Sequence, residues 1–534
     1  MSAGDRLWRL RQSGQPGWLG QSGQRALALF VALALLAVAC DKPNLEGPVV
    51  SAPAVPTPTP LSADGVNGLG GGSLEPTTPG LSDELIRLGV VADIAGLNED
   101  NAVTSGSEAA WLAMKAWEVS VNERGGLAGR NVEVVLFDAN VFDHRGAVRE
   151  ACASDIFALV GSYALGDGNG VDLLNAPSCR LPDFPAAALS PDRRESEVTF
   201  VSNPTSNLIW NAGPAQYLQQ RFGQATNAVA TVILDLPVAF YQAQREIEAA
   251  TSAGYVYVHQ ATADVVDQDY DDLALELQSS GAQAVSWTAD GQRMLQLLDA
   301  WVRLDNVVDS VLNNGVADDA GSVDAGSVDA GSSSAGAAGD ATGDSTGDAT
   351  GDDDRQNEPG NSGVLFQCGA DCYSQDWAEP AGQLSEDVWV SINMLPFEEA
   401  GHNVELVRYV LSLRELANPD AELNLVGLSS WASALLFEEA VNRARFLSGG
   451  GLTRELVIEA ANTITEWDGQ GLHGLTNPAE GLPSSCFMLV TPTTSGWIRR
   501  HPATAGTMDC ESDNLVELTE SATLGLNVAG LSVN

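Results

Sequence analysis

The chain has 534 residues, of which 71 are acidic and 26 are lysine or arginine, so its formal net charge is −45. This excess of negative charge argues against binding to nucleic acid and against electrostatic attachment to an anionic membrane. Hydrophobic residues make up 44% of the sequence, and a chain of this length predicts more than one folded core.

The first forty residues have the pattern of an export signal. Arginines precede an uninterrupted apolar stretch, residues 26–39, which is too short for a comfortable membrane span and suits a signal peptide. Small residues, Ala37 and Ala39, stand just before Cys40. The pattern predicts a lipoprotein signal over residues 1–39, with Cys40 lipidated as the mature N-terminus. An ordinary cleaved signal followed by an unmodified cysteine is the alternative.

A linker follows the signal. Residues 40–82 are rich in Pro, Gly, Ser and Thr and lack periodic apolar residues, which predicts a disordered tether. No later stretch is apolar for long enough to span a membrane. The chain is therefore expected to be held at the membrane only through its N-terminal lipid.

The run of residues 86–138 predicts a complete βαβ unit. A short apolar strand, Ile86–Val91, leads into a loop of small residues and then a helix with apolar positions between Ala109 and Val119. Gly125 and Gly126 are suited to end that helix. A second strand, Val132–Phe137, follows. Ligands of parallel α/β sheets bind beyond the carboxyl ends of the strands, so the loops after these strands are candidate functional loops.

Strands and helices alternate through the rest of the chain, which indicates parallel sheets covered by helices. Further strands are predicted at residues 157–160, 184–188, 228–234, 255–260, 284–287, 364–367 and 388–394. Further helices are predicted at residues 147–153, 170–175, 209–222, 242–253, 270–278, 292–304, 405–416, 430–446 and 453–463. Residues 486–490 and 496–500 predict a closing hairpin.

One segment interrupts this alternation. Residues 313–361 consist largely of Gly, Ala, Ser and Asp, with few large apolar residues, and predict a disordered acidic insertion in a surface loop. Its repeated Gly-Asp-Ala/Ser-Thr-Gly-Asp pattern lacks the large apolar residue that calcium-binding β-roll repeats use, so an ion site is not expected there.

The βαβ unit, with its helix ending Asn-Glu-Arg-Gly-Gly-Leu-Ala-Gly-Arg, resembles the start of the type I periplasmic solute-binding proteins, in particular the branched-chain amino-acid and amide binders of ABC importers. The resemblance covers roughly residues 86–512. It implies an α/β fold of two doubly wound parallel-sheet lobes joined by a multi-strand hinge. Lobe one is expected to contain residues 83–204 and 397–475, and lobe two residues 205–396 and 476–534, with the insertion inside lobe two.

The resemblance also implies where a ligand would lie, because six loops after strands line the cleft between lobes in these proteins. By position, the predicted ligand-binding residues are Ser162, Tyr163, Ala164, Leu189, Ser190, Asp290 and Tyr373. An amino-acid ligand would need an acidic partner for its ammonium group, and Asp235 or Asp290 is the candidate. Phe240, Tyr241, Trp287 and Trp377 are the candidate apolar walls.

Six cysteines remain after Cys40, and an even number in an exported chain predicts disulfides. The preferred pairs are Cys152–Cys179, Cys368–Cys372 and Cys486–Cys510, although other pairings remain open. Scattered histidines and irregular cysteine spacing argue against a metal site. No cofactor is expected.

The sequence carries no nucleophile elbow, no phosphate-binding loop and no zinc-protease motif, so catalysis is not expected. The leading interpretation is a lipid-anchored solute-binding protein that delivers a small polar ligand to an ABC permease by hinge closure. A lipid-anchored sensor with the same fold is the alternative. An exported enzyme on this scaffold is the weakest of the three.

Overall fold

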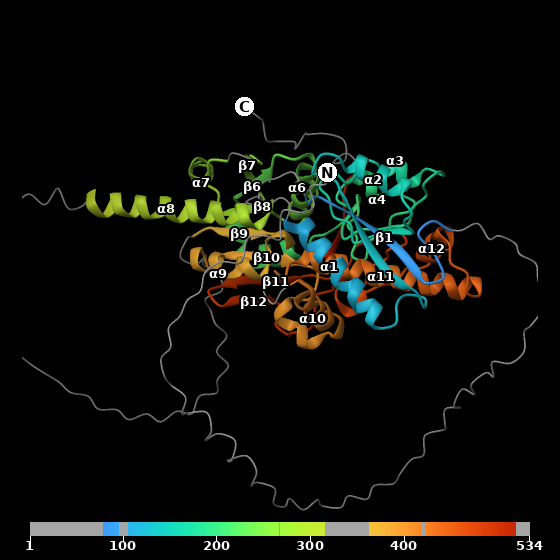
Figure 1. The fold of residues 1–534 in the computed structure, drawn as a ribbon. Coiled ribbons are helices and arrows are strands. Elements are labelled where there is room, and N and C mark those ends of the chain that lie inside the picture. The colour runs from blue at the N-terminus through green and yellow to red at the C-terminus, as the bar shows by residue number, and fades with distance from the viewer. Residues whose placement is uncertain (1–77, 95–104, 266–267, 316–362, 418–421, 520–534) are drawn as a thin grey trace, which may run out of the picture. The chain divides into compact units, whose positions relative to one another are not determined.

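The computed structural model describes residues 78–94, 105–265, 268–315, 363–417 and 422–519 (Figure 1). The predicted signal peptide, Cys40, the tether as far as residue 77 and the insertion from residue 316 to 361 lie outside the described residues. Across the described ranges, no helix combines the length and the apolar character needed to cross a bilayer.

The first sheet has four parallel strands in the order β2-β1-β3-β4. They are β1 (Leu85–Ala92), β2 (Asn131–Asp138), β3 (Ala158–Val160) and β4 (Asp183–Phe184). Helix α1 (Ser105–Glu123) connects β1 to β2, as the βαβ prediction required. Strand β4 is shorter than predicted because Pro185 follows it and has no N–H group to donate to the ladder.

Helices from two distant parts of the chain surround this sheet, some directly on it and others, such as α10 and α12, on the helices that cover it (Figure 1). They are α2 (His144–Ala153), α3 (Val171–Asn175), α4 (Pro191–Arg194), α10 (Val404–Ala417), α11 (Leu425–Ser448) and α12 (Arg454–Ala461). Helix α11 brings Phe437 edge-on against Phe157 and Phe184, at ring distances of 6.3 and 5.3 Å. Its Ser430 hydroxyl donates a 3.0 Å hydrogen bond to the Gly161 carbonyl. We call this sheet with its helices lobe one.

The second sheet has seven strands in the order β12-β11-β10-β9-β8-β6-β7. They are β6 (Val229–Leu234), β7 (Tyr257–Ala263), β8 (Ala284–Thr288), β9 (Leu365–Cys368), β10 (Val388–Ile392), β11 (Met488–Thr493) and β12 (Gly496–His501). Strands β7, β6, β8, β9 and β10, in their order across the sheet, are parallel. Strands β11 and β12 continue the sheet at one edge and pair antiparallel. The predicted closing hairpin therefore extends the sheet of lobe two and makes it mixed.

Helices α5 (Gly213–Thr226) and α6 (Pro237–Ser252) pack on one face of the second sheet. Helices α7 (Tyr270–Ser279), α8 (Gly291–Gly315) and α9 (Gln375–Leu384) complete this lobe. The strand register shows which side chains share a face of the sheet. Ser286 and Gln367 lie side by side on one face, and Val285 and Phe366 lie side by side on the other. Trp301 of α8 packs edge-on against Phe366, so α8 covers the face opposite to α6. This sheet with its helices is lobe two.

The predicted helix over residues 209–222 is wrong at its start. Residues Ile209–Asn211 form strand β5, which pairs antiparallel with the C-terminal strand β13 (Leu515–Glu517). Helix α5 begins only at Gly213, with Pro214 in its first turn. A short apolar run fits either a strand or a helix, and here a partner distant in sequence decides the outcome.

Three chain segments pass between the lobes and contact one another. His473 in the third segment forms an isolated bridge with Met394 in the second, beside the 3₁₀ helices η3 (Phe397–His402) and η4 (Gly469–Gly471). The His473 Nε2 atom accepts a 2.8 Å hydrogen bond from the hydroxyl of Ser202 in the first segment, and its Nδ1–H donates to the Gly474 carbonyl. Burial lowers the pKa of His473 to about 4. The crossover is thus built around a neutral imidazole.

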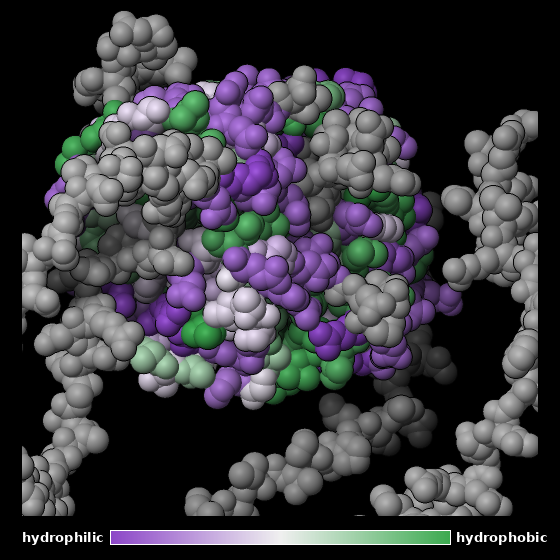
Figure 2. All heavy atoms as spheres, turned by 90° about the vertical axis from the view of Figure 1, so that its left-hand side faces the viewer, coloured by the Kyte–Doolittle hydropathy of each residue, from purple (hydrophilic) through white to green (hydrophobic). Residues whose placement is uncertain are grey.

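The structure contains the three predicted disulfides, Cys152–Cys179, Cys368–Cys372 and Cys486–Cys510. On the face drawn in Figure 2, hydrophilic residues cover much of the surface, and the hydrophobic ones lie in patches among them. This surface agrees with the strongly acidic composition.

Candidate ligand-binding cleft

A cavity of about 510 Å³ opens where the strand ends of the two sheets face each other. Lobe one contributes Tyr163 and Leu189 to its lining, and lobe two contributes Asp290, Asp371 and Tyr373. The crossover segments also reach it. The volume falls within the range of about 300–1,000 Å³ that is typical of small-molecule sites.

Four of the seven predicted ligand-binding residues line this cavity, namely Tyr163, Leu189, Asp290 and Tyr373. Ser162, Ala164 and Ser190 are not part of the lining. The buried Ser162 hydroxyl accepts a 3.0 Å hydrogen bond from the Val91 N–H. Ser190 caps α4, where its hydroxyl accepts from the Arg193 N–H. These positions hold the loops in place rather than face the cleft.

The loops of lobe one are held by carboxylates of the chain itself. Asp93 accepts hydrogen bonds from the N–H groups of Val141 and Leu165, at 2.9 and 2.8 Å. Asp167 accepts from the N–H groups of Leu189 and Ser190, at 2.6 and 3.0 Å. Backbone donors of the kind that could hold an anionic ligand are therefore already paired with internal carboxylates.

Asp290 is neutralised by a neighbour on α8. Its carboxylate accepts a hydrogen bond from the Arg293 N–H at 3.0 Å and forms an ion pair with the Arg293 guanidinium. Tyr373 lies just beyond the 3₁₀ turn η2 (Ala370–Cys372), and its hydroxyl donates to Glu398 at 2.6 Å while accepting from the Phe397 N–H. Both residues face the cleft with their polar groups committed.

Asp371 is a cavity residue that was not predicted from the sequence, since Asp235 and Asp290 are the acidic candidates there. It lies between Cys368 and Cys372, whose disulfide closes the turn, and it lines the cavity. The Asp371 side chain is open to water in the cleft, but the surrounding walls displace part of its hydration shell. This desolvation, increased by the nearby Asp290 carboxylate, raises the pKa of Asp371 to about 6.

Glu246 of α6 was also missed, because a glutamate on a helix gives no sequence signal that separates a cavity wall from a solvated face. Its carboxylate accepts hydrogen bonds of 3.0 Å from the Gln242 amide and from the Thr288 hydroxyl. Desolvation raises the pKa of Glu246 to about 7, with Asp371 adding to the shift.

Of the predicted apolar walls and the acidic candidate Asp235, some line the cavity and others do not. Trp287 and Trp377 line the cavity, whereas Asp235, Phe240 and Tyr241 do not. Asp235 is exposed to solvent. The Tyr241 hydroxyl donates to the Asn207 side chain, so this ring supports the loop that leaves the first crossover.

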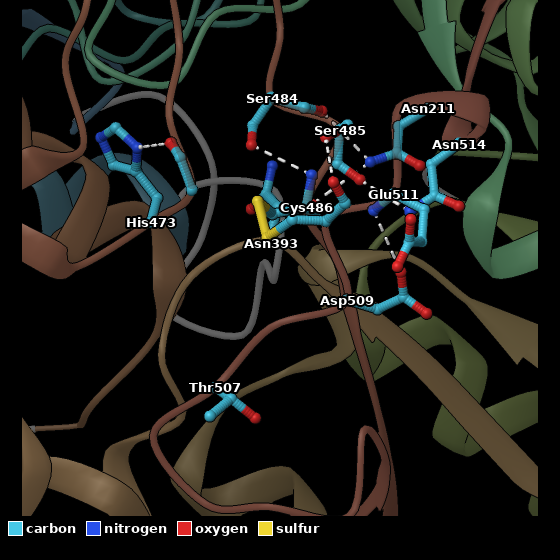
Figure 3. Close-up of a disulfide and its surroundings, with 12 residues drawn as sticks. Asn211, Asn393, His473, Ser484, Ser485, Cys486, Thr507, Asp509, Glu511 and Asn514 are labelled. Atoms are coloured by element: carbon cyan, nitrogen blue, oxygen red, sulfur yellow. Dashed lines mark hydrogen bonds between the residues drawn. A yellow bond between two sulfur atoms is a disulfide. The ribbon is translucent and has the colours of Figure 1, made fainter.

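A C-terminal clasp borders the cavity and consists of strand β13, the Cys486–Cys510 disulfide and the residues between them (Figure 3). The Asn211 amide of β5 donates to the carbonyls of Ser484 and Cys486, both at 3.2 Å. The Asn514 amide donates to the Ser485 carbonyl at 3.0 Å. Because Asn211, Ser484 and Cys486 all line the cavity, the clasp fixes part of its wall.

Within the described ranges, no group of three or more His, Cys, Asp and Glu side chains is placed to hold a metal ion. The cavity is lined instead by carboxyls, amides, hydroxyls and aromatic rings together with aliphatic side chains. Such groups position and recognise a ligand through hydrogen bonds, charge and contact area.

Comparison with protein-family models finds no match, and neither does comparison with curated proteins. Solved structures do match. A branched-chain amino acid ABC transporter protein from Thermus thermophilus with bound valine aligns with a TM-score of 0.58 and 13% identity, over 81% of this chain and 98% of that chain. A fatty acid ABC transporter substrate-binding protein from Thermomonospora curvata aligns with a TM-score of 0.56 and 14% identity, over 80% and 97%.

A solute-binding protein of an ABC transporter from R. palustris in complex with benzoate aligns with a TM-score of 0.55 and 11% identity, over 80% of this chain and 98% of that chain. At these identities the likeness establishes the fold. Two lobes, each with a parallel sheet core, three crossovers and a cleft at the strand ends agree with it. The chain therefore has the fold of the type I periplasmic binding proteins.

Proposed function

We propose that this protein is an extracytoplasmic solute-binding protein, lipid-anchored through Cys40, that captures a small polar ligand and delivers it to an ABC permease. The observation that supports this most directly is the cavity of about 510 Å³ between the two lobes, with walls from both sheets and from the crossover segments. The structures with a similar fold belong to ABC transporter proteins for amino acids, fatty acids or benzoate.

The mechanism in this proposal is hinge closure. A ligand that touches Tyr163 of lobe one and Asp371 of lobe two gains contacts in the closed state that the open state lacks. The equilibrium then shifts toward the closed state by the difference in binding free energy. The crossover around Ser202, Met394 and His473 supplies the hinge. The permease would recognise the closed arrangement, and no bond in the ligand is made or broken.

A thermal-shift screen of the purified chain against amino acids, amides, amines and carboxylic acids tests the proposal. A ligand present at about 100 times its dissociation constant stabilises the folded state by about 2.7 kcal/mol, which is a clear rise in melting temperature. At least one hit is expected, and a compact state on binding should appear in small-angle scattering. Absence of any hit over the whole panel would contradict capture of a small solute and favour the alternative of a lipid-anchored sensor with the same fold.

The lipid anchor has its own test. Mass spectrometry of the protein expressed with residues 1–39 should find Cys40 as the N-terminal residue carrying acyl chains, and Cys40→Ala should release the protein from membranes. An unmodified Cys40 in a processed chain would refute anchoring and leave solute capture untouched.

A further inference from the structure

The cavity has an arm that leaves the interlobe cleft and enters lobe two between the second sheet and helices α5 and α6. Ser286, Gln367 and Trp389 line it from adjacent strands β8, β9 and β10 and share one face of the sheet by register. Leu218 of α5 lines it from the other side. Ser286 and Gln367 keep partial exposure although their strands are central in the sheet. That exposure faces the internal space of the arm.

The arm combines aromatic walls with polar groups. Tyr255 and Tyr257 line it, and the Tyr255 hydroxyl donates a 2.9 Å hydrogen bond to the Gln367 side-chain oxygen. The Gln367 amide nitrogen is buried and has no hydrogen-bond partner among the described residues. A ligand in the arm would pack its body on these rings.

The lobe-one side of the cavity is poorly suited to an anionic ligand group. The N–H groups of Leu189 and Ser190 donate to Asp167, and that of Leu165 donates to Asp93. Of the described residues that line the cavity, Arg194 is the single cationic one. Its guanidinium donates to the carbonyls of Ala188 and Leu189, at 2.9 and 3.0 Å. These backbone donors are therefore not left for a ligand carboxylate, and the chain itself holds three of the five guanidinium donors of Arg194.

The lobe-two side carries the opposite charge. Glu246, Asp290 and Asp371 line the cavity from lobe two, and of these three only Asp290 is paired with an arginine in the described part of the chain. Glu246 lines the cavity and accepts a 3.0 Å hydrogen bond from the hydroxyl of Thr288, which ends β8 two residues beyond Ser286 on the same sheet face. Glu246 therefore lies where the arm joins the cleft, and its electrostatic interaction with Asp371 agrees with this place. A positive charge at this junction would relieve the repulsion between the carboxyls.

We infer that the ligand is an organic amine with an extended apolar body, whose ammonium group lies between Glu246 and Asp371 and whose body occupies the arm against Tyr257 and Trp389. This inference rests on the proposed function, because it names the ligand class of the same cleft. The two carboxylates supply the charge recognition, and the aromatic rings add contact area and favour a nearby cation.

Three probes of matched length and different charge test it, namely octylammonium, octan-1-ol and octanoate. Their affinities would be measured by calorimetry on the whole mature chain, at about pH 8, where the amine is charged. Octylammonium is expected to bind at least about tenfold more tightly than either other probe, which is about 1.4 kcal/mol. Octanoate binding as tightly as octylammonium, or more tightly, would overturn the inference.

Two variants localise the charge. Glu246→Gln and Asp371→Asn should each weaken octylammonium by about tenfold or more and change octanol by less than about twofold. Asp235→Asn is the matched control, since this exposed carboxyl also follows a strand of lobe two but lies outside the cavity. Equal affinity of all three variants for octylammonium would refute the assigned position.

Ser391→Leu fills the arm from its floor, because Ser391 lines the cavity on the same sheet face as Trp389. It should weaken octylammonium about tenfold and leave ethylammonium unchanged. If octanoate or an amino acid binds and octylammonium does not, the inference fails while solute capture stands. If no probe of any charge binds, the inference fails, and solute capture fails with it only when the thermal-shift panel also gives no hit.

Discussion

The hydroxyl of Thr288, at the end of β8, donates a 3.0 Å hydrogen bond to the carboxyl of Glu246 on α6. This contact joins the sheet of lobe two to the helix that covers it, at the point where the cleft meets the arm. It also places a titratable group inside the cavity wall, so stability and binding become linked to the same side chain.

Glu246→Gln should raise the stability of the ligand-free protein at neutral and alkaline pH. The pKa of Glu246 is about 7 in the folded chain and 4.5 in its ordinary state. As pH rises from 4.5 to 7, the Glu246 carboxyl ionises in the unfolded chain before it ionises in the folded chain. The carboxyl therefore lowers the free energy of unfolding progressively over this range, and the full loss applies above pH 7. Urea unfolding should give the variant a free energy of unfolding about 1–3 kcal/mol higher than that of the parent at high pH, and this difference should disappear at low pH. A pH-independent difference would show that ionisation is not its source.

His473→Asn should reduce the loss of stability in acid. Burial lowers the pKa of His473 from 6.5 to about 4, so the unfolded chain takes up this proton first as pH falls. The stabilising contribution is present above pH 6.5 and is lost progressively toward pH 4. Urea unfolding should give a flatter pH dependence for the variant than for the parent between these values. His259→Asn, at a partly exposed histidine paired with Glu276, is the control; an equal flattening there would argue against the crossover as the origin.

Gly161→Ala should destabilise lobe one. Gly161 has a φ of +71°, and an added Cβ would lie 2.4 Å from the side chain of Met114. Strain and overpacking together predict a loss of about 2–4 kcal/mol in unfolding free energy. Gly129→Ala is matched for backbone strain, with a φ of +76° and no atom within 4 Å of the added Cβ, so it should cost about 1–2 kcal/mol. Chemical denaturation of both variants measures the difference, and equal losses would exclude a role for the Met114 contact.

Replacing Cys486 and Cys510 by serine should loosen the C-terminal clasp. The disulfide closes a chain separation of 24 residues, and loss of such a bridge costs about 3 kcal/mol. Because Asn211 and Cys486 line the cavity, the double variant should also bind its ligand more weakly. The Cys152–Cys179 pair, with a separation of 27 and a place in lobe one, is the control. Replacing Cys152 and Cys179 by serine should lower the free energy of unfolding by a similar amount and leave the affinity for the ligand unchanged. Chemical denaturation and binding measurements on the two double variants test this.

Much of the fold could be predicted from local pattern. Periodic apolar residues and glycines after helices placed β1, α1 and β2 to within one or a few residues, because these signals arise within a single element. The hairpin of β11 and β12 was also predicted. Strand β5 was not, since Ile209–Asn211 pairs with a strand at the other end of the chain. Local sequence carries no information on that pairing.

The candidate site was likewise predicted only in part. The resemblance to the type I binding proteins, carried over by position in the loops after strands, predicted Tyr163, Leu189, Asp290 and Tyr373, and these four line the cavity. It did not reveal that Asp167 already holds the N–H groups of Leu189 and Ser190. Nor did it reveal Glu246, whose role depends on which face of α6 meets the sheet.

The sequence by itself determined the acidic charge, the alternation of strands and helices and the loops that could meet at a cleft, because each is set by composition or by neighbours along the chain. Only the tertiary structure decided which polar groups are committed within the protein and which remain for a ligand. Asp167, Glu246 and Asp371 are all ordinary carboxylates in the sequence. Much of what sets their chemistry comes from residues distant along the chain, such as Leu189 for Asp167, Thr288 for Glu246 and Asp290 for Asp371.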